Sequence, residues 1–256
     1  MEGIGWENSE IATGSTILIR PNQTTPDADG NTVYADKRVR QALAMAVDNN
    51  ICLELGYANK GAPADNHHAG SMHPEHDPSV GRLPYDPAKA KALMAEAGMA
   101  DYEHELISID DDWRKNTTDA VAAQLRDAGI KVKRTILPGS TFWNDWAKYP
   151  FSSTNWNHRP FAVQVWGLAY RSGEAWNEAA FNNAEFDELL SKALATANAD
   201  ERRVIMERIQ QIMQDEGVII QPYWRSIFRH KRKSLVGQSD MHPTFENRFQ
   251  YMGFNA

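Results

Sequence analysis

Hydrophobic and polar residues along this chain repeat with periods that alternate between those of strands and those of helices. Residues 16–20 form a short apolar run typical of a buried strand, and a polar segment rich in Asp, Asn, Thr and Gly follows at residues 21–34. From Asp36 to Ile51 the apolar positions lie on one face of a helix, so a single helix is predicted there. Residues 61–84 hold several prolines and show little periodicity, which indicates a long loop.

The middle of the chain predicts a parallel pair of strands. Residues 103–109 alternate as a strand, residues 113–128 carry a helical apolar stripe that ends at Gly129, and residues 130–136 alternate again. Short connections between a strand, a helix and the next strand favour a right-handed crossover, in which the two strands run parallel. An α/β fold is therefore expected.

Start and stop signals predict three further helices. A capping carboxylate followed by proline opens a helix at residues 86–98, and residues 186–197 carry apolar positions at helical spacing. Asp200 is expected to cap another helix, which a glycine ends. Residues 218–224 form an apolar strand interrupted by Pro222, so we expect an edge strand or a strand end there.

Composition and charge narrow the class of protein. The 256 residues are 42% hydrophobic and 24% charged, with a net charge of -7, and basic residues cluster only at residues 225–233. These values are typical of a soluble chain with one large or two modest domains, and the lack of a basic face argues against nucleic-acid binding. Cys52 is the single cysteine, so no internal disulfide can form, and the helical pattern around it indicates a small buried residue.

The chain carries no sequence signal for membrane insertion or export. No apolar run approaches the ~20 residues that cross a bilayer. Residues 1–10 include acidic residues and no basic one, so no signal peptide is recognised. Taken alone, these features indicate a cytoplasmic chain.

The densest chemical signal is an aromatic stretch at residues 142–176. Amides and guanidinium groups are interleaved with its rings, whereas a plain core would be built from Leu, Ile and Val. Such a mixture is typical of a cleft that stacks on a small ligand and orients it by hydrogen bonds, although each ring taken singly also suits an ordinary core. The predicted ligand contacts are Trp143, Asn155, Trp156, His158, Arg159, Trp166, Tyr170, Arg171 and Trp176.

No catalytic motif is recognisable. Asp110, Asp111 and Asp112 follow a predicted strand, where consecutive carboxylates serve more often as a helix cap and solvated charges than as an acid–base pair. The sequence contains no nucleophile elbow, phosphate-binding loop, dinucleotide fingerprint or zinc-protease motif. We therefore expect a protein that is not an enzyme, with no catalytic residues and no cofactor.

The loop predicted at residues 61–84 offers a metal-binding alternative. Its imidazoles and the neighbouring carboxylates could hold Zn²⁺ or Ni²⁺. The histidines concerned are His67, His68, His73 and His76. The loop lacks the periodicity of a rigid scaffold, so no metal site is assigned, and metal binding by this loop is kept as the alternative function.

Several segments of the chain carry motifs in a fixed order. Residues 36–48 read DKRVRQALAMAVD, residues 85–98 read YDPAKAKALMAEAG, and residues 181–190 read FNNAEFDELL. Each segment is similar to a motif of the family 5 solute-binding proteins of bacterial ABC importers, which include dipeptide, oligopeptide, nickel and glutathione binders. The resemblance extends over roughly residues 15–225.

The resemblance implies one lobe of a two-lobed periplasmic binding protein of the class II type, with a mixed sheet and flanking helices. We expect an N-terminal stub at residues 1–14, a ligand-binding lobe at residues 15–225, and a tail at residues 226–256 that returns to the first lobe. Because family members are much longer, the chain is expected to be a truncated fragment of a periplasmic receptor whose signal peptide is absent here.

The function implied by the resemblance is to bind a small solute, peptide-like or carboxylate-bearing, between two lobes and to deliver it to an ABC permease in the membrane. Ala169 stands where peptide-binding members carry an Asp that anchors an amino group, whereas Arg171 in the same turn suits a carboxylate. Apolar surface that a first lobe would cover is expected to be exposed, so self-association of the fragment is predicted.

Overall fold

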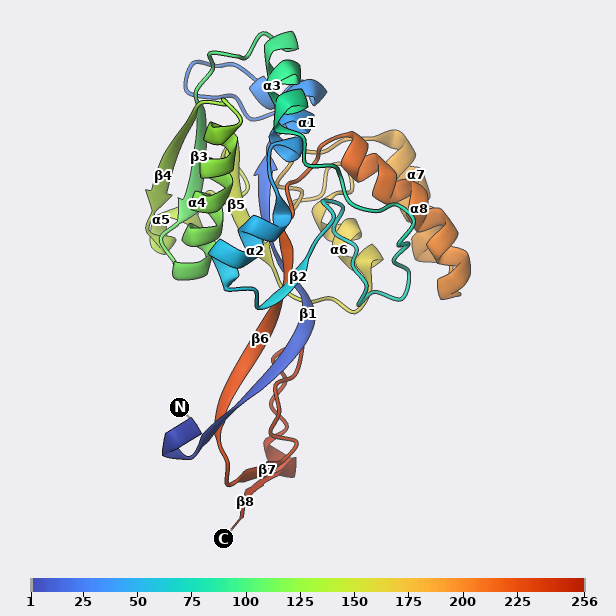
Figure 1. Cartoon of the computed structure of the whole chain (residues 1–256). Helices are drawn as coiled ribbons and strands as arrows, with labels where there is room; N and C mark the ends of the chain where they lie inside the picture. The colour runs from blue at the N-terminus through green and yellow to red at the C-terminus, as the bar shows by residue number, and fades with distance from the viewer. Residues whose placement is uncertain (1, 256) are drawn as a thin grey trace.

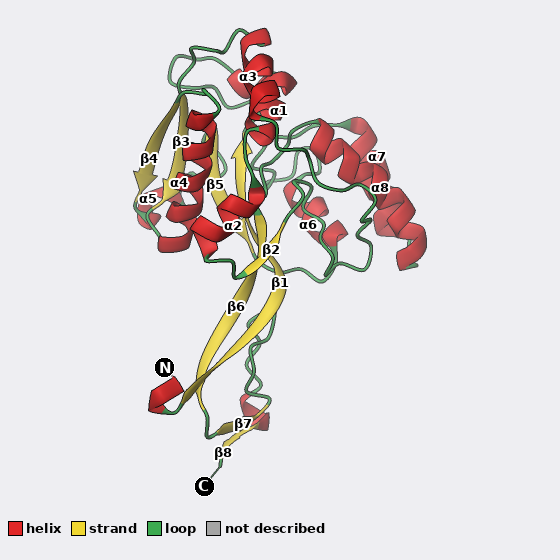
Figure 2. Ribbon diagram, viewed as in Figure 1, coloured by secondary structure: helices red, strands yellow, loops and turns green. Residues whose placement is uncertain are grey.

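The computed structural model describes residues 2–255, which fold around a mixed sheet with flanking helices (Figures 1 and 2). The strands are β1 (Trp6–Pro21), β2 (Gly61–Pro63), β3 (His104–Ile109), β4 (Val132–Leu137), β5 (Phe151–Trp156), β6 (Tyr223–Arg232), β7 (Leu235–Gly237) and β8 (Met252–Phe254). The α-helices are α1 (Lys37–Met45), α2 (Asn49–Tyr57), α3 (Pro87–Glu96), α4 (Asp112–Asp127), α5 (Gly139–Phe142), α6 (Ala162–Ala169), α7 (Ala184–Ala195) and α8 (Ala199–Asp215). Short 3₁₀ helices lie at Glu2–Ile4, Val33–Ala35 and Phe249–Tyr251. Among the described residues, no helix combines the length and apolar character needed to cross a membrane.

The main sheet has the strand order β2-β6-β1-β5-β3-β4. β3 and β4 are parallel, as the strand–helix–strand pattern predicts, and α4 connects them. β1 is antiparallel to both β5 and β6. The sheet is therefore mixed, which confirms the predicted α/β fold class.

Successive side chains of β1 face two separate hydrophobic clusters. Ile17 and Ile19 belong to a cluster that includes residues of α1, α2, α3 and α4, whereas Leu18 belongs to a cluster built from α6, α7 and α8. Neighbouring side chains of a strand point to opposite faces of the sheet. The inner part of β1 is thus covered on both faces, which explains its continuous apolar run.

Beyond the body of the domain, β1 and β6 continue as a two-stranded ribbon. Their pairing extends from Thr16 with Trp224 down to Trp6 with Arg232, and Figure 1 shows the ribbon projecting away from the helices toward β7 and β8. The strand predicted at residues 16–20 is confirmed but is longer, and most of the predicted N-terminal stub is strand. The outer half of β1 is rich in polar residues because neither of its faces lies in a hydrophobic core, so a search for apolar runs does not find this part of the strand.

The backbone divides one predicted helix into two. In place of a single helix from Asp36 to Ile51, α1 ends at Met45 and Asp48 caps α2 by accepting a hydrogen bond from the Asn50 backbone N–H. Ile51 is consequently 38% exposed instead of buried. The helices α3, α4 and α7 and the strands β3 and β4 lie where the sequence predicts them.

Other local predictions are corrected by the surrounding structure. β6 begins just after Pro222 and lies between β1 and β2, so the proline precedes an inner strand instead of ending an edge strand. The cap of α8 is Asn198 and not Asp200. At the start of α4, Asp111 makes no capping hydrogen bond and pairs instead with Arg114, with 2.7 Å between Oδ2 and Nη1.

Candidate functional site

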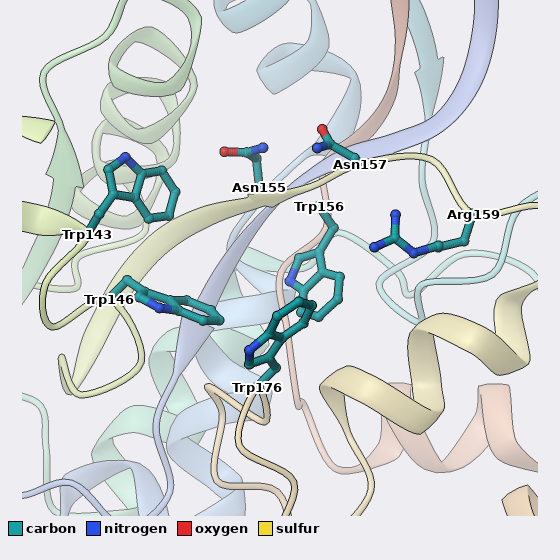
Figure 3. A pocket seen from close by; sticks show the side chains of 7 residues that line it. All are labelled: Trp143, Trp146, Asn155, Trp156, Asn157, Arg159 and Trp176. Atoms are coloured by element: carbon teal, nitrogen blue, oxygen red, sulfur yellow. The ribbon is translucent and has the colours of Figure 1, made fainter. Parts of the chain in front are cut away.

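An aromatic cleft lies at the end of β5 (Figure 3). It has a volume of about 230 Å³ and is lined by Trp143, Trp146, Asn155, Trp156, Asn157, Arg159 and Trp176. Its walls come from β5 and from the segments that follow α5, precede α6 and precede α7. The fold therefore gathers most of the polar–aromatic stretch of the sequence around one opening.

The tryptophans of the cleft differ in how far they are buried. Trp143 is 42% exposed and Trp176 is 48% exposed, whereas Trp156 is only 6% exposed. The rings of Trp156 and Trp176 meet edge to face, with 5.9 Å between centroids and 67° between planes. Exposed indole rings keep apolar faces open, so the cleft can stack on a flat or apolar part of a ligand.

The polar groups of the cleft are mainly donors. Arg114 Nε donates to Asn155 Oδ1 at 2.8 Å, and Arg225 Nη2 approaches Asn157 Oδ1 at 3.5 Å. Because arginine only donates, these contacts assign the amide oxygens and leave both amide NH₂ groups for a ligand. Arg159 donates to the preceding backbone carbonyl at 3.1 Å, and Figure 3 shows its guanidinium pointing toward the indoles. The cleft is suited to a ligand with acceptor oxygens.

A buried ion pair connects the walls of the cleft. Arg20 Nε donates to Glu178 Oε2 at 2.9 Å, and the exposed fractions of the two side chains are 0% and 2%. The same guanidinium donates to the backbone carbonyls of Trp146 and Tyr149, while Glu178 Oε1 accepts from Trp156 Nε1 at 2.9 Å. Burial lowers the pKa of Arg20 and Glu178 opposes that effect. A guanidinium remains charged in such a setting. The pair therefore positions several wall segments at once.

The structure brings several of the predicted ligand contacts together in this cleft. They are Trp143, Asn155, Trp156, Arg159 and Trp176. Trp146 and Asn157 complete the lining, although the sequence did not single them out. Both belong to the aromatic stretch, and their close spacing to Trp143 and Asn155 is the signal that could have identified them.

The other predicted contacts lie away from the lining. Trp166 and Tyr170 are fully buried and form hydrogen bonds with the histidine-containing loop. His158 Nδ1 accepts a hydrogen bond from a backbone N–H of β1 at 2.9 Å. Arg171 extends to Ser191 on α7, with 3.4 Å between Nη2 and Oγ. The guanidinium that reaches the cleft is therefore that of Arg159, and Arg171 is not placed as a carboxylate anchor.

The histidines of the loop before α3 do not converge on one point. His68 and His73 bond separately to a tyrosine hydroxyl and to backbone groups. Burial lowers the pKa of His67 to about 3 and that of His73 to about 4, so both rings are neutral at pH 7. Within the described part of the chain, only His67 and His76 among these histidines share a potential ligand group, together with Asp65.

Comparison with known proteins places these features in a family. The model of the "Bacterial extracellular solute-binding proteins, family 5 Middle" matches residues 2–178. Heme-binding protein A of Haemophilus influenzae is 28% identical over 200 residues, which are 72% of this chain and 35% of the relative. Di/tripeptide-binding protein 2 of Pseudomonas aeruginosa is 26% identical over 238 residues, which are 87% of this chain and 44% of the relative. The chain thus spans less than half the length of these curated relatives.

A solved structure shares the fold. The oligopeptide-binding protein AppA from Bacillus subtilis, determined in complex with a nonapeptide, has a TM-score of 0.84 to this chain at 20% sequence identity. The match covers 98% of this chain and 53% of that chain. This coverage agrees with the predicted single lobe of a two-lobed protein.

Proposed function

Because the chain belongs to the bacterial extracellular solute-binding proteins of family 5, we propose that it binds a small solute for an ABC importer. Its relatives are named for the heme or the di- and tripeptides that they bind, so they are binding proteins and not enzymes. Residues 15–225 form the lobe that holds the solute against a second lobe, and the receptor acts outside the cytoplasmic membrane, in the periplasm. Solute binding favours the closed state, which docks on a membrane permease.

The solute that fits the cleft carries a carboxylate beside an apolar or aromatic part. The observation behind this proposal is the grouping of three donors, on Asn155, Asn157 and Arg159, next to the exposed rings of Trp143 and Trp176. A carboxylate accepts paired hydrogen bonds from a guanidinium, whereas an ammonium group would be repelled by it. Peptide-like acids belong to this class of solute.

Replacing Arg159 with Gln is expected to weaken the binding of a carboxylate solute by about 10- to 150-fold, because a hydrogen bond to a charged group contributes about 1.5–3 kcal/mol. Calorimetry with a dipeptide and its C-terminal primary amide should show the larger loss for the acid. Arg171→Gln is the matched control, because Arg171 lies outside the cleft lining. Equal losses for acid and amide, or an equal effect of the control, would contradict the assignment.

The tail, residues 226–256, carries an exposed aromatic surface. Phe249 is 74% exposed, Tyr251 58% and Phe254 70%. They lie in and beside β8, at the far end of the ribbon (Figure 1). Exposed apolar patches of this kind usually have a partner. In a two-lobed receptor the other lobe covers this surface, and the chain on its own associates with a second copy through it.

Light scattering is expected to give a mass above the 28.9 kDa of one chain, rising with protein concentration. The double variant Phe249→Ser with Phe254→Ser should shift the population toward the monomer, since it removes the exposed rings. Val204→Ser serves as the control, because Val204 is 72% exposed on α8 and lies outside the tail. A monodisperse wild-type monomer at all concentrations would argue against this role of the tail.

A further inference from the structure

Three potential metal ligands lie together in the loop between β2 and α3, outside the lining of the aromatic cleft. They are Asp65, His67 and His76, and each offers one ligand atom within 4.8 Å of the others. His67 is 1% exposed, while Asp65 and His76 are partly exposed. One of the three potential ligands is therefore buried, and the other two lie near the surface.

The buried member of this group has an unused nitrogen. His67 Nε2 is buried and has no hydrogen-bond partner among the described residues. A buried polar atom without a partner destabilises the fold, so such an atom in a native protein calls for a ligand, an ion or a water molecule. Two imidazoles and a carboxylate form the donor set that Zn²⁺ and related divalent ions prefer.

We propose that Asp65, His67 and His76 form a binding site for a divalent transition-metal ion of the Zn²⁺ class. Three protein ligands leave one coordination position for water or for a further ligand. The histidine-rich segment thus contributes only two of its imidazoles, and the other partner is a carboxylate that precedes them. His68 and His73 are committed to separate hydrogen bonds and take no part.

Side chains from two helices hold the backbone of two of these ligand residues in place. Trp166 Nε1, on α6, donates to the carbonyl of His67 at 3.1 Å, and Gln214 Nε2, on α8, donates to the carbonyl of Asp65 at 2.6 Å. A tetrahedral site with bonds of about 2.0–2.2 Å separates its ligand atoms by roughly 3.4 Å. The ligand atoms of the three residues lie within 4.8 Å of one another. To bind a metal they must therefore come closer by at most roughly 1.4 Å, and partly exposed side chains can make that movement.

A neighbouring arginine orients the carboxylate of the group. Arg82 Nε donates to Asp65 Oδ1 at 3.0 Å, which leaves Oδ2 for a metal. Hydrogen bonds of this kind fix the direction of a metal-bound carboxylate. One contact opposes binding: the Ala69 backbone N–H donates to His67 Nδ1 at 3.2 Å, and this long hydrogen bond is lost when Nε2 takes the metal and Nδ1 carries the proton.

Calorimetric titration of the untagged protein with ZnCl₂ alone is expected to show one saturable site per chain. His76→Gln and Asp65→Asn should each weaken that site ~10-fold or more, because each removes one of three ligands. These positions are partly exposed, so both variants are expected to fold, and circular dichroism checks this. His242→Gln is the matched control: His242 lies 3.5 Å from Glu246 in the tail, a histidine–carboxylate pair outside the group.

The coordination can be read independently with Co²⁺, whose visible absorption is intense in a tetrahedral site. The wild-type protein should show that absorption, and folded His76→Gln should not. Three results would overturn the proposal: no saturable Zn²⁺ binding, unchanged affinity in folded Asp65→Asn and His76→Gln, or an equal loss in the His242→Gln control. None of these outcomes depends on whether the aromatic cleft binds a solute.

Discussion

Lowering the pH from 7 to 5 is expected to reduce the free energy of unfolding by about 4 kcal/mol through two buried histidines alone. Burial lowers the pKa of His73 to about 4 and that of His104 to about 4. In the unfolded chain each ring titrates near its ordinary value of about 6.5. Between these values the unfolded state binds more protons, so stability is fully present above about pH 6.5 and is lost as the pH falls toward 4.

The size of this effect follows from proton linkage. Each ring contributes about 2 kcal/mol of the loss between pH 7 and pH 5. The pKa of His68 is lowered well below its usual value by burial, which acts in the same direction. Since domains are stable by only about 5–15 kcal/mol, this loss is a large share of the stability of a typical domain.

Urea denaturation at pH 7, 6 and 5, in buffer with EDTA to exclude metal binding, measures the predicted slope. His104→Gln keeps an amide that can form a hydrogen bond with the Tyr34 hydroxyl, which lies 3.1 Å from His104 Nδ1, but it cannot take up a proton. Its loss between pH 7 and pH 5 should be smaller than that of the wild type by about 2 kcal/mol. His230→Gln, at an exposed position on β6, is the control and should keep the wild-type slope. Equal stability of the wild type at pH 7 and pH 5 would contradict the prediction.

Arg20→Met is expected to lower the free energy of unfolding by about 3–5 kcal/mol, the usual result of removing one partner of a buried ion pair. Glu178 would be left as a buried carboxylate without its counter-charge. The carbonyls of Trp146 and Tyr149 would lose their donor at the same time. Because the same pair positions the cleft, the variant should also change the fluorescence of its tryptophans.

The matched control is the surface pair formed by Arg208 and Glu185. Arg208 Nε lies 2.7 Å from Glu185 Oε1, but the two side chains are 46% and 51% exposed. Exposed pairs contribute about 0–1 kcal/mol, so Arg208→Met should change stability little. If Arg20→Met were as mild as Arg208→Met in urea denaturation, the buried pair could not be what holds the cleft walls.

The parts of the fold that could be predicted are those encoded locally. The strand–helix–strand unit of β3, α4 and β4 follows from side-chain periods and glycine stops within a short span. The ribbon could not be found in this way, because its residues are polar and their pairing depends on a partner from the other end of the chain. The break between α1 and α2 depends on a capping geometry that one Asp in a helical pattern does not reveal.

The candidate site was predictable as a region and not as a set of residues. The mixture of rings, amides and guanidinium groups located the aromatic stretch, but composition does not tell which side of an element each residue occupies. Trp166 lies on the buried face of α6, whereas Trp176 lies in a connecting segment and keeps an exposed face. The role of Glu178 in joining the walls depends on Arg20, which comes from a distant strand.

The place of β1 in the sheet also governs when the protein can finish folding during its synthesis. β1 leaves the ribosome long before β6, the strand with which it pairs, and Thr16 bonds to Tyr223 across 207 residues of sequence. Closing so long a loop is slow, whereas β3, α4 and β4 can form from local contacts. Until β6 emerges, the apolar residues of β1 remain without their partner strand, and a nascent chain in that state is prone to aggregate.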